Sequence, residues 1–323
     1  SNGALTAGRR NADHALFPYC TQDKLFESFR SVGSCTLLWV ETETGSVLWE
    51  PFRSDIRGTR RRRNLFKSID GNQVIFEETD AALGLRFRYS WMMGERFGFI
   101  RRASLENLTG VSVTVRVLDG IQNIVPYGLD QNFVGHFSNL ADAYKKNELL
   151  SEEGLGIYYL SSIPTDRAEP SEGLKASVVW STGLDRSGVL LCSRQLEAFR
   201  AGESLATEEE TRGERCSYLV ESSVELTGRE SKEWWLAAEI EQDAAQIEGL
   251  RQALAEGKGM AAALRKDFLE NRAELRAKVS ASDGLQLTAN RIRDARHRSN
   301  TLFNVMRGGV FNDAYQLSVA DFK

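Results

Sequence analysis

The chain has 323 residues, of which 41% are hydrophobic and 27% charged. This composition is typical of folded globular proteins and excludes a disordered, collagen-like or disulfide-scaffold protein. The 41 basic and 45 acidic residues give a net charge of -4, which argues against a dedicated binder of nucleic acids or anionic membranes, because such proteins need a surplus of Lys and Arg. No apolar run approaches the ~18 residues that span a bilayer. We therefore expect neither nucleic acid nor a membrane among the partners.

The four cysteines, Cys20, Cys35, Cys192 and Cys216, form no C-x-x-C pair and have no nearby histidine pair. This spacing predicts free, buried thiols in a reducing compartment and no metal site. We expect a cytoplasmic location. The chain begins at Ser1 rather than at a methionine, which leaves a periplasmic or secreted location open.

Short apolar or alternating runs separated by Gly, Asn, Asp and Ser predict strands from Cys35 to about Ile240. In residues 85–91 the apolar side chains occupy the odd positions, which predicts one buried and one solvated face. Many strands with no helix between most of them indicate a large antiparallel β-sandwich or barrel. The predicted strands are residues 35–41, 73–78, 83–91, 97–105, 111–118, 155–160, 175–181, 189–192, 217–226 and 233–240.

The apolar spacing becomes helical after Ile240. Asp243 is the predicted N-cap of a first helix that ends near Gly257, a second helix contains Leu264 and Phe268, and a third runs from about Asp283 to Gly308. Strands followed by helices indicate segregated layers, mainly β with an α+β arrangement. We expect a β-sandwich domain in residues 1–240 and a helical segment in residues 241–323.

Two basic segments have competing interpretations. Residues 57–64 contain five arginines between predicted strands, so we expect a solvated loop, or one paired with acidic residues such as Glu208, Glu209 and Glu210, rather than a nucleic-acid site. Residues 291–298 place basic residues on much of a helix whose apolar face contains Ile292. We expect that basic side to be the solvated side of a packed helix.

Motifs for catalysis are absent: there is no nucleophile elbow, P-loop, zinc-protease helix, calcium loop or dinucleotide fingerprint. His14, His136 and His297 are too dispersed to predict a metal centre. The tryptophans in or beside strands are expected to be core residues rather than sugar platforms. The sequence therefore predicts no catalytic residue, no metal ligand and no cofactor.

Residues 123–150 give the strongest binding signal. A predicted strand leads into a polar stretch that we interpret as a long loop, and its Tyr127, Asp130, Asn132 and His136 combine phenol, carboxyl, amide and imidazole groups. This mixture satisfies sugar hydroxyls. We expect these four residues to contact sugar, weakly. The equal alternative is a loop that only docks a neighbouring domain.

Three groups of segments carry a family resemblance: residues 12–19 with 48–52, residues 124–128 with 138–148, and residues 299–309. Together they resemble the N-terminal part of large bacterial cellobiose-phosphorylase-like proteins. That group is similar to inverting glycoside phosphorylases and hydrolases that join a galactose-mutarotase-like β-supersandwich to a helical linker and an (α/α)6 barrel. The resemblance implies that the general acid and any phosphate site lie on the barrel, so no catalytic residue transfers to this chain.

These observations lead us to expect a non-catalytic N-terminal β-supersandwich and helical linker from a carbohydrate-active enzyme, a glycoside phosphorylase or hydrolase. Its partners would be the C-terminal catalytic barrel, the oligosaccharide or glycoside substrate of the parent enzyme and, as an open alternative, a second copy in a homodimer. The alternative function is a free-standing carbohydrate-binding or mutarotase-like protein, which would need a positioned acid and base. A third alternative is an oligomerisation module that uses the helices and an apolar patch.

Overall fold

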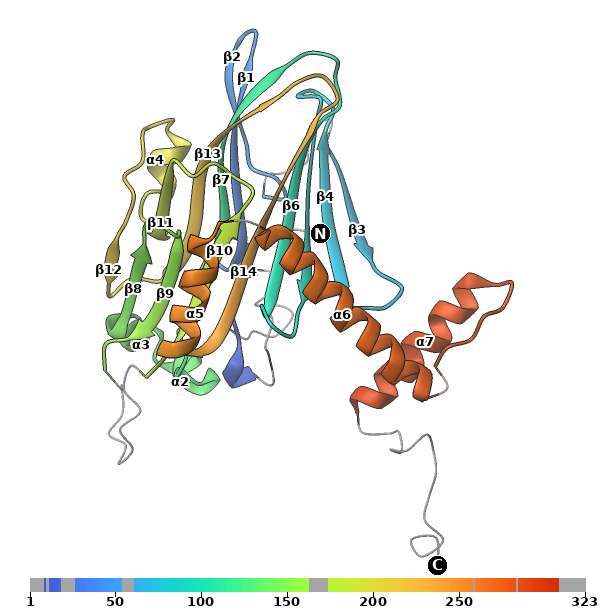
Figure 1. The fold of residues 1–323 in the computed structure, drawn as a ribbon. Coiled ribbons are helices and arrows are strands. Elements are labelled where there is room, and N and C mark those ends of the chain that lie inside the picture. Colours follow the sequence, from blue (N-terminus) through green and yellow to red (C-terminus); the bar gives the residue numbers. More distant parts are fainter. Residues whose placement is uncertain are drawn as a thin grey trace, which may run out of the picture.

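The computed structural model describes residues 9, 12–18, 27–53, 61–162, 174–257, 259–282 and 284–307. Two antiparallel sheets form a sandwich, with helices after it in the chain (Figure 1). The five-stranded sheet has the order β11 (Gly188–Cys192), β13 (Cys216–Leu226), β7 (Val113–Ile124), β1 (Gly33–Thr42) and β2 (Gly45–Trp49). The nine-stranded sheet has the order β12 (Glu210–Arg212), β8 (Lys145–Leu150), β9 (Leu155–Leu160), β10 (Lys175–Thr182), β14 (Ser231–Asp243), β6 (Phe99–Asn107), β5 (Leu85–Met93), β4 (Gln73–Asp80) and β3 (Arg61–Lys67).

The main core lies between the two sheets. Phe87 and Tyr89 of β5 point into it, whereas Arg88 between them is exposed, as the alternation predicts. Trp234 belongs to this core, and its neighbour Trp235 points to the opposite face of the sheet, where helices cover it. The expectation that the strand-associated tryptophans are core residues is confirmed, because Trp49, Trp91, Trp180, Trp234 and Trp235 are all buried.

Helices cover the outer faces of the sheets. Helix α5 (Ala244–Ala255) and helix α6 (Met260–Ala281) pack against the nine-stranded sheet through a second cluster that includes Trp180 and Leu264. The short helix α4 (Leu196–Arg200) packs on the five-stranded sheet through Leu196 and Phe199. Burial on both faces explains why β10 reads as a nearly continuous apolar run.

All ten predicted strands are present, and four further strands, β2, β3, β8 and β12, were missed. The described part of the arginine segment is not a loop. Its residues 61–64 belong to β3, where Arg61 pairs with Asp80 and Arg63 with the buried Glu78 of β4. The arginines therefore pair with the adjacent strand, not with Glu208–Glu210, because their side chains lie beside acidic partners in the β3–β4 register. Residues 54–60 lie outside the described residues.

One helix start is as predicted: Asp243 caps α5 through a capping box with Gln246. The last helix differs from the prediction in two respects. Helix α7 (Arg291–Met306) begins after its N-cap Asn290, later than expected, because the Asn290 side chain accepts the hydrogen bond from the Arg293 amide. The buried side of this helix is also the opposite of the one predicted. Ile292, which was expected to pack, is 66% exposed, whereas Arg298, which was expected to face solvent, is 5% exposed.

Residues 123–150, interpreted as one long loop, are also ordered differently. After β7 they form helix α2 (Gln131–His136), helix α3 (Ser138–Tyr144) and strand β8. The two helices are held by a small apolar cluster that contains Leu129 and Ala141. Two 3₁₀ helices, η1 (Ala12–His14) and η2 (Ser28–Arg30), precede the sandwich in the chain.

The described cysteines, Cys35, Cys192 and Cys216, are buried and free, as expected, and Cys20 lies outside the described residues. Burial raises the pKa of Cys35 to about 11 and that of Cys216 to about 12. Neither thiol is therefore a ready nucleophile near neutral pH. Within the described part of the chain, no helix combines the length and the apolar character needed to cross a bilayer.

Candidate functional site: a polar cleft where β14 leads into α5

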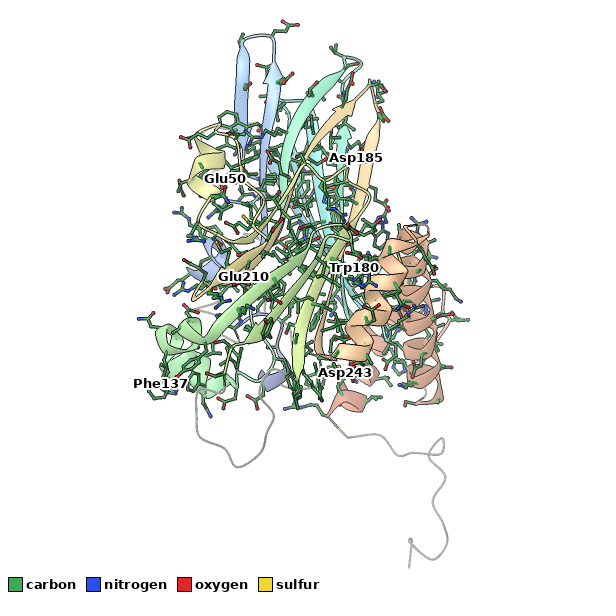
Figure 2. The ribbon with its side chains drawn as sticks, turned by 60° about the vertical axis from the view of Figure 1, so that its left-hand side comes forward. Glu50, Phe137, Trp180, Asp185, Glu210 and Asp243 are labelled. Carbon is green, nitrogen blue, oxygen red and sulfur yellow. The ribbon has the colours of Figure 1, made fainter. Side chains whose placement is uncertain are left out.

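A cavity of about 600 Å³ lies where the last strand of the sandwich passes into the first of the long helices. Figure 2 marks this end of the molecule by Asp243. The residues around the cavity come from the chain start, the β5–β6 turn, the first residue of β10, the end of β14 and the first turns of α5. They are Arg9, Glu95, Arg96, Lys175, Glu239, Ile240, Glu241, Gln242, Asp243 and Gln246.

A bulge in β14 shapes the cleft. Val178 of β10 lies opposite Glu239, but Ala176 lies opposite Gln242, so β14 contains one extra residue at this point. Glu241 sits in the bulge with φ at 62°, a left-handed conformation that few residues other than glycine adopt. Such bulges redirect side chains near functional sites. Glu239 and Glu241 both line the cleft at this bulge.

Glu239 is the more enclosed of the two carboxyl groups. Its Oε2 lies 3.2 Å from Nη2 of Arg9, and its Oε1 accepts a hydrogen bond from its neighbour, the Ile240 amide, at 3.0 Å. Burial raises the pKa of Glu239 above its ordinary value, and the carboxylates of Glu95 and Asp267 raise it further, against the opposing effects of the Ile240 amide and Arg9. This carboxyl group therefore retains its proton to a higher pH than an exposed glutamate does.

Glu241 has a cationic and aromatic surrounding. Its Oε1 accepts from Nζ of Lys175 at 3.0 Å and from the Tyr127 hydroxyl at 3.4 Å, and its Oε2 lies 3.9 Å from Nε2 of His14. The Lys175 ammonium lies 5.5 Å from the centre of the Tyr127 ring, within the range of a cation–π contact. Carboxyl, ammonium and guanidinium groups thus line the cleft, and the Tyr127 phenol lies beside it through its bond to Glu241.

This set of groups suits a neutral ligand with many hydroxyls. Carboxylate and amide oxygens accept from hydroxyl groups, and the guanidinium and ammonium groups donate to them. The volume lies within the usual range for small-molecule sites, about 300–1,000 Å³. No group of three or more metal-ligating side chains occurs among the described residues.

The four residues selected from the sequence do not share one site. Tyr127 lies beside the cleft through its bond to Glu241. The Asp130 carboxylate caps α2 by accepting from the Phe133 amide at 2.7 Å, and Nδ1 of His136 lies 2.9 Å from the backbone oxygen of Asn132, with both of these residues exposed on α2. Within the described residues, no hydrogen bond or ring contact joins Tyr127 to the other three.

Sequence reasoning missed the residues that form the cleft, namely Arg9, Lys175, Glu239 and Glu241. Glu239 and Glu241 read as the polar positions of an alternating strand, and nothing local signals the bulge between them. The only local signal was Asp243, the N-cap that marks the change from strand to helix. The polar residues just before this transition from strand to helix could therefore have indicated a binding site.

No family model matches the chain, and no curated protein matches it. Among solved structures, it is similar to a bacterial glucoamylase complexed with acarbose, at 8% identity and a TM-score of 0.40 over 85% of this chain and 31% of that one. It is also similar to a putative kojibiose phosphorylase from the human microbiome, at 9% identity and a TM-score of 0.39 over 82% and 30% of the two chains. A polysaccharide lyase matches at 9% identity and a TM-score of 0.43 over 77% and 34%.

The chain spans about a third of the length of these solved structures. Identities and TM-scores this low assign neither an activity nor a substrate.

Proposed function

We propose that this chain is the non-catalytic β-sandwich and helical linker of a carbohydrate-active enzyme, a glycoside phosphorylase or hydrolase, whose catalytic barrel it supports. The family resemblance of the three sequence segments supports this proposal, and so does the order of strands followed by helices. The observation that carries it is the orientation of α7, which turns its apolar side away from the rest of the described chain.

Helix α7 lies against the far part of α6 (Figure 1), and its Arg298 pairs with Asp70 in the turn between β3 and β4. Ile292, Phe303 and Met306 are 66%, 53% and 78% exposed. Their spacings of 11 and 3 residues place them within about 60° of one another on a helix that turns 100° per residue. Arg298 and Thr301, on the other side, are buried. An exposed apolar stripe of this kind is typical of a surface that another domain covers, and we propose that the barrel covers it.

Hydrophobic-dye fluorescence tests this scaffold function. We expect the chain to bind the dye in its native state, and the double variant Ile292→Ser/Phe303→Ser to lose most of that signal without a change in circular dichroism. Val111→Ser, which removes an isolated apolar side chain that is 71% exposed in the β6–β7 turn, is the matched control. Dye binding that is unchanged by the double variant, or that persists when the chain is extended through its downstream barrel, contradicts the proposal.

We further propose that the cleft at the β14–α5 junction contacts sugar, with Tyr127 as its aromatic component. One partly covered ring and a few hydrogen bonds that compete with water support only weak binding, of millimolar order and about 4 kcal/mol. Asp130, Asn132 and His136 keep a place in the proposal as outer contacts, since α2 follows Tyr127 directly in the chain.

Titration of the chain with cellobiose, followed by nuclear magnetic resonance, tests the sugar contact. Tyr127→Ala should abolish saturable shifts, and Glu241→Gln should weaken them. Tyr159→Ala is the matched control, because Tyr159 also lies near a lysine, with Nζ of Lys146 at 5.4 Å from its ring. Tyr159 lies on β9 near Lys146, which is not a lining residue, whereas Tyr127 bonds to Glu241 of the cleft lining. Equal behaviour of the two tyrosine variants contradicts a role for Tyr127.

One observation favours the second candidate, a mutarotase-like protein. Ring opening of a sugar requires an acid and a base, and the cleft contains the Glu239 carboxyl group, whose pKa burial raises, beside Glu241 with His14 at 3.9 Å. His136, the histidine considered from the sequence, is exposed on α2 instead. Faster exchange between glucose anomers in the presence of the chain, lost in Glu239→Gln, would favour this candidate over the non-catalytic one.

A further inference from the structure

A second cavity, of about 560 Å³, lies between the turn that follows β2 and the helix α4. Figure 2 labels Glu50 of this cavity well away from Asp243 of the sugar cleft. Its described lining consists of four arginines, two glutamates and one leucine: Arg30, Leu48, Glu50, Arg53, Arg61, Glu197 and Arg200. Arginine therefore dominates the wall of this cavity.

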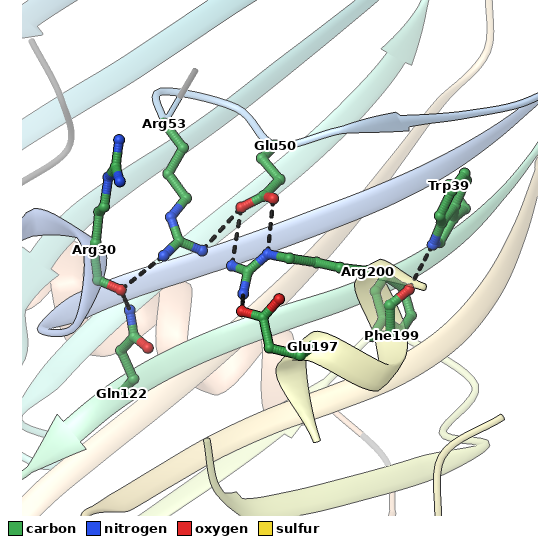
Figure 3. A network of polar contacts seen from close by, with 8 residues as sticks. All are labelled: Arg30, Trp39, Glu50, Arg53, Gln122, Glu197, Phe199 and Arg200. Atoms are coloured by element: carbon green, nitrogen blue, oxygen red, sulfur yellow. Dashed lines mark hydrogen bonds and ion pairs between the residues drawn. The ribbon is translucent and has the colours of Figure 1, made fainter. Parts of the chain in front are cut away.

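Glu50 fixes two of the guanidinium groups side by side. Its Oε1 accepts from Nε of Arg200 at 2.9 Å, and its Oε2 accepts from Nη2 of Arg200 at 3.1 Å and from Nη1 of Arg53 at 2.8 Å (Figure 3). Burial alone would raise the pKa of Glu50, but the hydrogen bonds and charges of Arg200 and Arg53 lower it. Glu50 therefore stays ionised and holds both arginines in place.

The same network positions Arg30 at the cavity. The backbone oxygen of Arg30 accepts from Nη2 of Arg53 and from Nε2 of Gln122, both at 2.9 Å. These bonds fix the end of η2 against β7, while the Arg30 guanidinium carries no dashed line in Figure 3. Its described contact is the Phe29 ring, 5.6 Å away. The donors of this guanidinium thus remain available to a ligand.

The charges of the described lining residues leave a positive surplus. Four arginines and two glutamates give +2, from 4 − 2. Arg61 pairs at 2.7 Å with Asp80, which lies outside the lining, and including that carboxylate still leaves +1. Guanidinium groups bind carboxylate and phosphate groups through paired hydrogen bonds. The wall therefore favours an anion and disfavours a cation of the same size.

We propose that this cavity binds a small organic anion through its phosphate or carboxylate group. Arg30 is the principal contact, and Arg53 and Arg200, which Glu50 and Glu197 hold in ion pairs, form the fixed wall beside it. The remainder of the ligand lies against Leu48 and the arginine stems, since these are the apolar parts of the lining. The volume suits a molecule of monosaccharide size. This site is separate from the proposed sugar cleft and does not depend on it.

Isothermal titration at low ionic strength tests the proposal with glucose 1-phosphate, glucuronate and glucose as probes. At least one of the two anions should bind saturably, and its affinity should fall as salt is added. The affinity for glucose should be at least tenfold lower than the affinity for that anion. The phosphate and carboxylate arms distinguish the two oxyanion sources. Tyr127→Ala should leave anion binding unchanged, so the failure of one proposed site can be told from that of the other.

Arg30→Gln should weaken anion binding at least tenfold. Arg62→Gln is the matched control, because it removes the same charge from an exposed position of β3. Arg62 follows Arg61 in the strand and therefore faces the opposite side of the sheet. Anion binding by this variant should stay within twofold of the unaltered chain. Absence of saturable anion binding by the folded chain, equal effects of the two variants, or glucose binding as tight as that of the anions overturns the proposal. Binding only to an acidic protein partner, with no free anion bound, overturns it as well.

Discussion

Asp119 and Arg101 form an ion pair between the two sheets, with side chains 2% and 0% exposed. Each Asp119 oxygen accepts from an Arg101 nitrogen, at 2.6 and 2.9 Å, and Thr36 and Trp234 also donate to this carboxylate at 2.6 Å each. Every lone-pair direction of the buried charge is thus occupied, which is the condition under which such a pair is tolerated in a core.

Removal of one member of this pair should be more damaging than removal of both. Asp119→Ala leaves the Arg101 guanidinium buried without its counter-charge, and we expect a loss of about 3–5 kcal/mol in the free energy of unfolding. The double variant Asp119→Leu/Arg101→Met should lose less. Urea denaturation followed by tryptophan fluorescence measures both. A double variant that is less stable than Asp119→Ala would show that the pair stabilises the fold outright.

At the scale of elements, one carboxylate joins α7 to α6 and to the sandwich. Asp70, in the turn between β3 and β4, pairs with Arg272 and Arg276 of α6 and with Arg298 of α7. Burial alone would raise the pKa of Asp70, but hydrogen bonds from Arg276 and Arg272 and the charge of Arg298 lower it below the ordinary 3.8. Three guanidinium groups share one counter-charge, so the contact depends on its ionisation.

This attachment should survive mild acid. A carboxyl group with a lowered folded pKa contributes stability above its unfolded pKa and loses it as the pH falls through the folded value. Hydrogen exchange of α7 amides, corrected for intrinsic rates, should therefore show full protection at about pH 5 and loss only below 3.8. Asp70→Asn should expose α7 even at pH 7. Glu274→Gln, at an exposed glutamate of α6 that pairs with Lys278, should behave as the unaltered chain; equal exchange in the two variants would refute the attachment.

The prediction of elements succeeded for most buried strands and missed three of the four strands at the sheet edges, together with the interior strand β8. The central strands carry apolar side chains on one or both faces, which gives a clear pattern. Strands β3 and β12 form the two edges of the nine-stranded sheet and β2 an edge of the five-stranded one. Their sequences are short or charged, as in Arg61–Lys67, since edge strands meet water and avoid pairing with other chains.

The candidate site was less predictable than the fold for a related reason. The aromatic part, Tyr127, was recognisable by residue type. The Glu241 carboxylate that meets it lies in a bulge of β14 more than a hundred positions away. A bulge is set by pairing with another strand rather than by local sequence. The reversed direction of α7 likewise follows from the position of Asp70, which α7's own periodicity cannot reveal.

For the whole molecule, the key contact is the one that fixes α6 to the sandwich. Asp267 of α6 accepts from the amides of Glu95, Arg96 and Phe97 in the β5–β6 turn, at distances from 2.9 to 3.2 Å. Gly94 begins this turn, and a Cβ there would lie 1.9 Å from Oδ2 of Asp267. The close approach of helix and turn therefore requires glycine.

Gly94→Ala should lower the free energy of unfolding by about 1–3 kcal/mol, because the added methyl group forces helix and turn apart. Gly110→Ala is the matched control, since a Cβ at that position meets nothing within 4 Å. Thermal unfolding compares the two, and protection of α6 amides should fall in the first variant alone. A melting temperature unchanged by Gly94→Ala would mean that the Asp267 contact can shift without loss.

The length of helix α6 also sets the direction in which the apolar stripe of α7 faces. Its 22 residues span about 33 Å at a rise of 1.5 Å each. Each residue inserted between the Asp267 and Asp70 contacts would advance the later part of the helix by about 1.5 Å and rotate it by about 100°. The direction of α7's apolar stripe is thus encoded by a residue count. An insertion of seven residues would restore the direction of the stripe to within about 20° while moving it some 10 Å outward. The length of this helix therefore sets both how far the stripe lies from the sandwich and which way it faces.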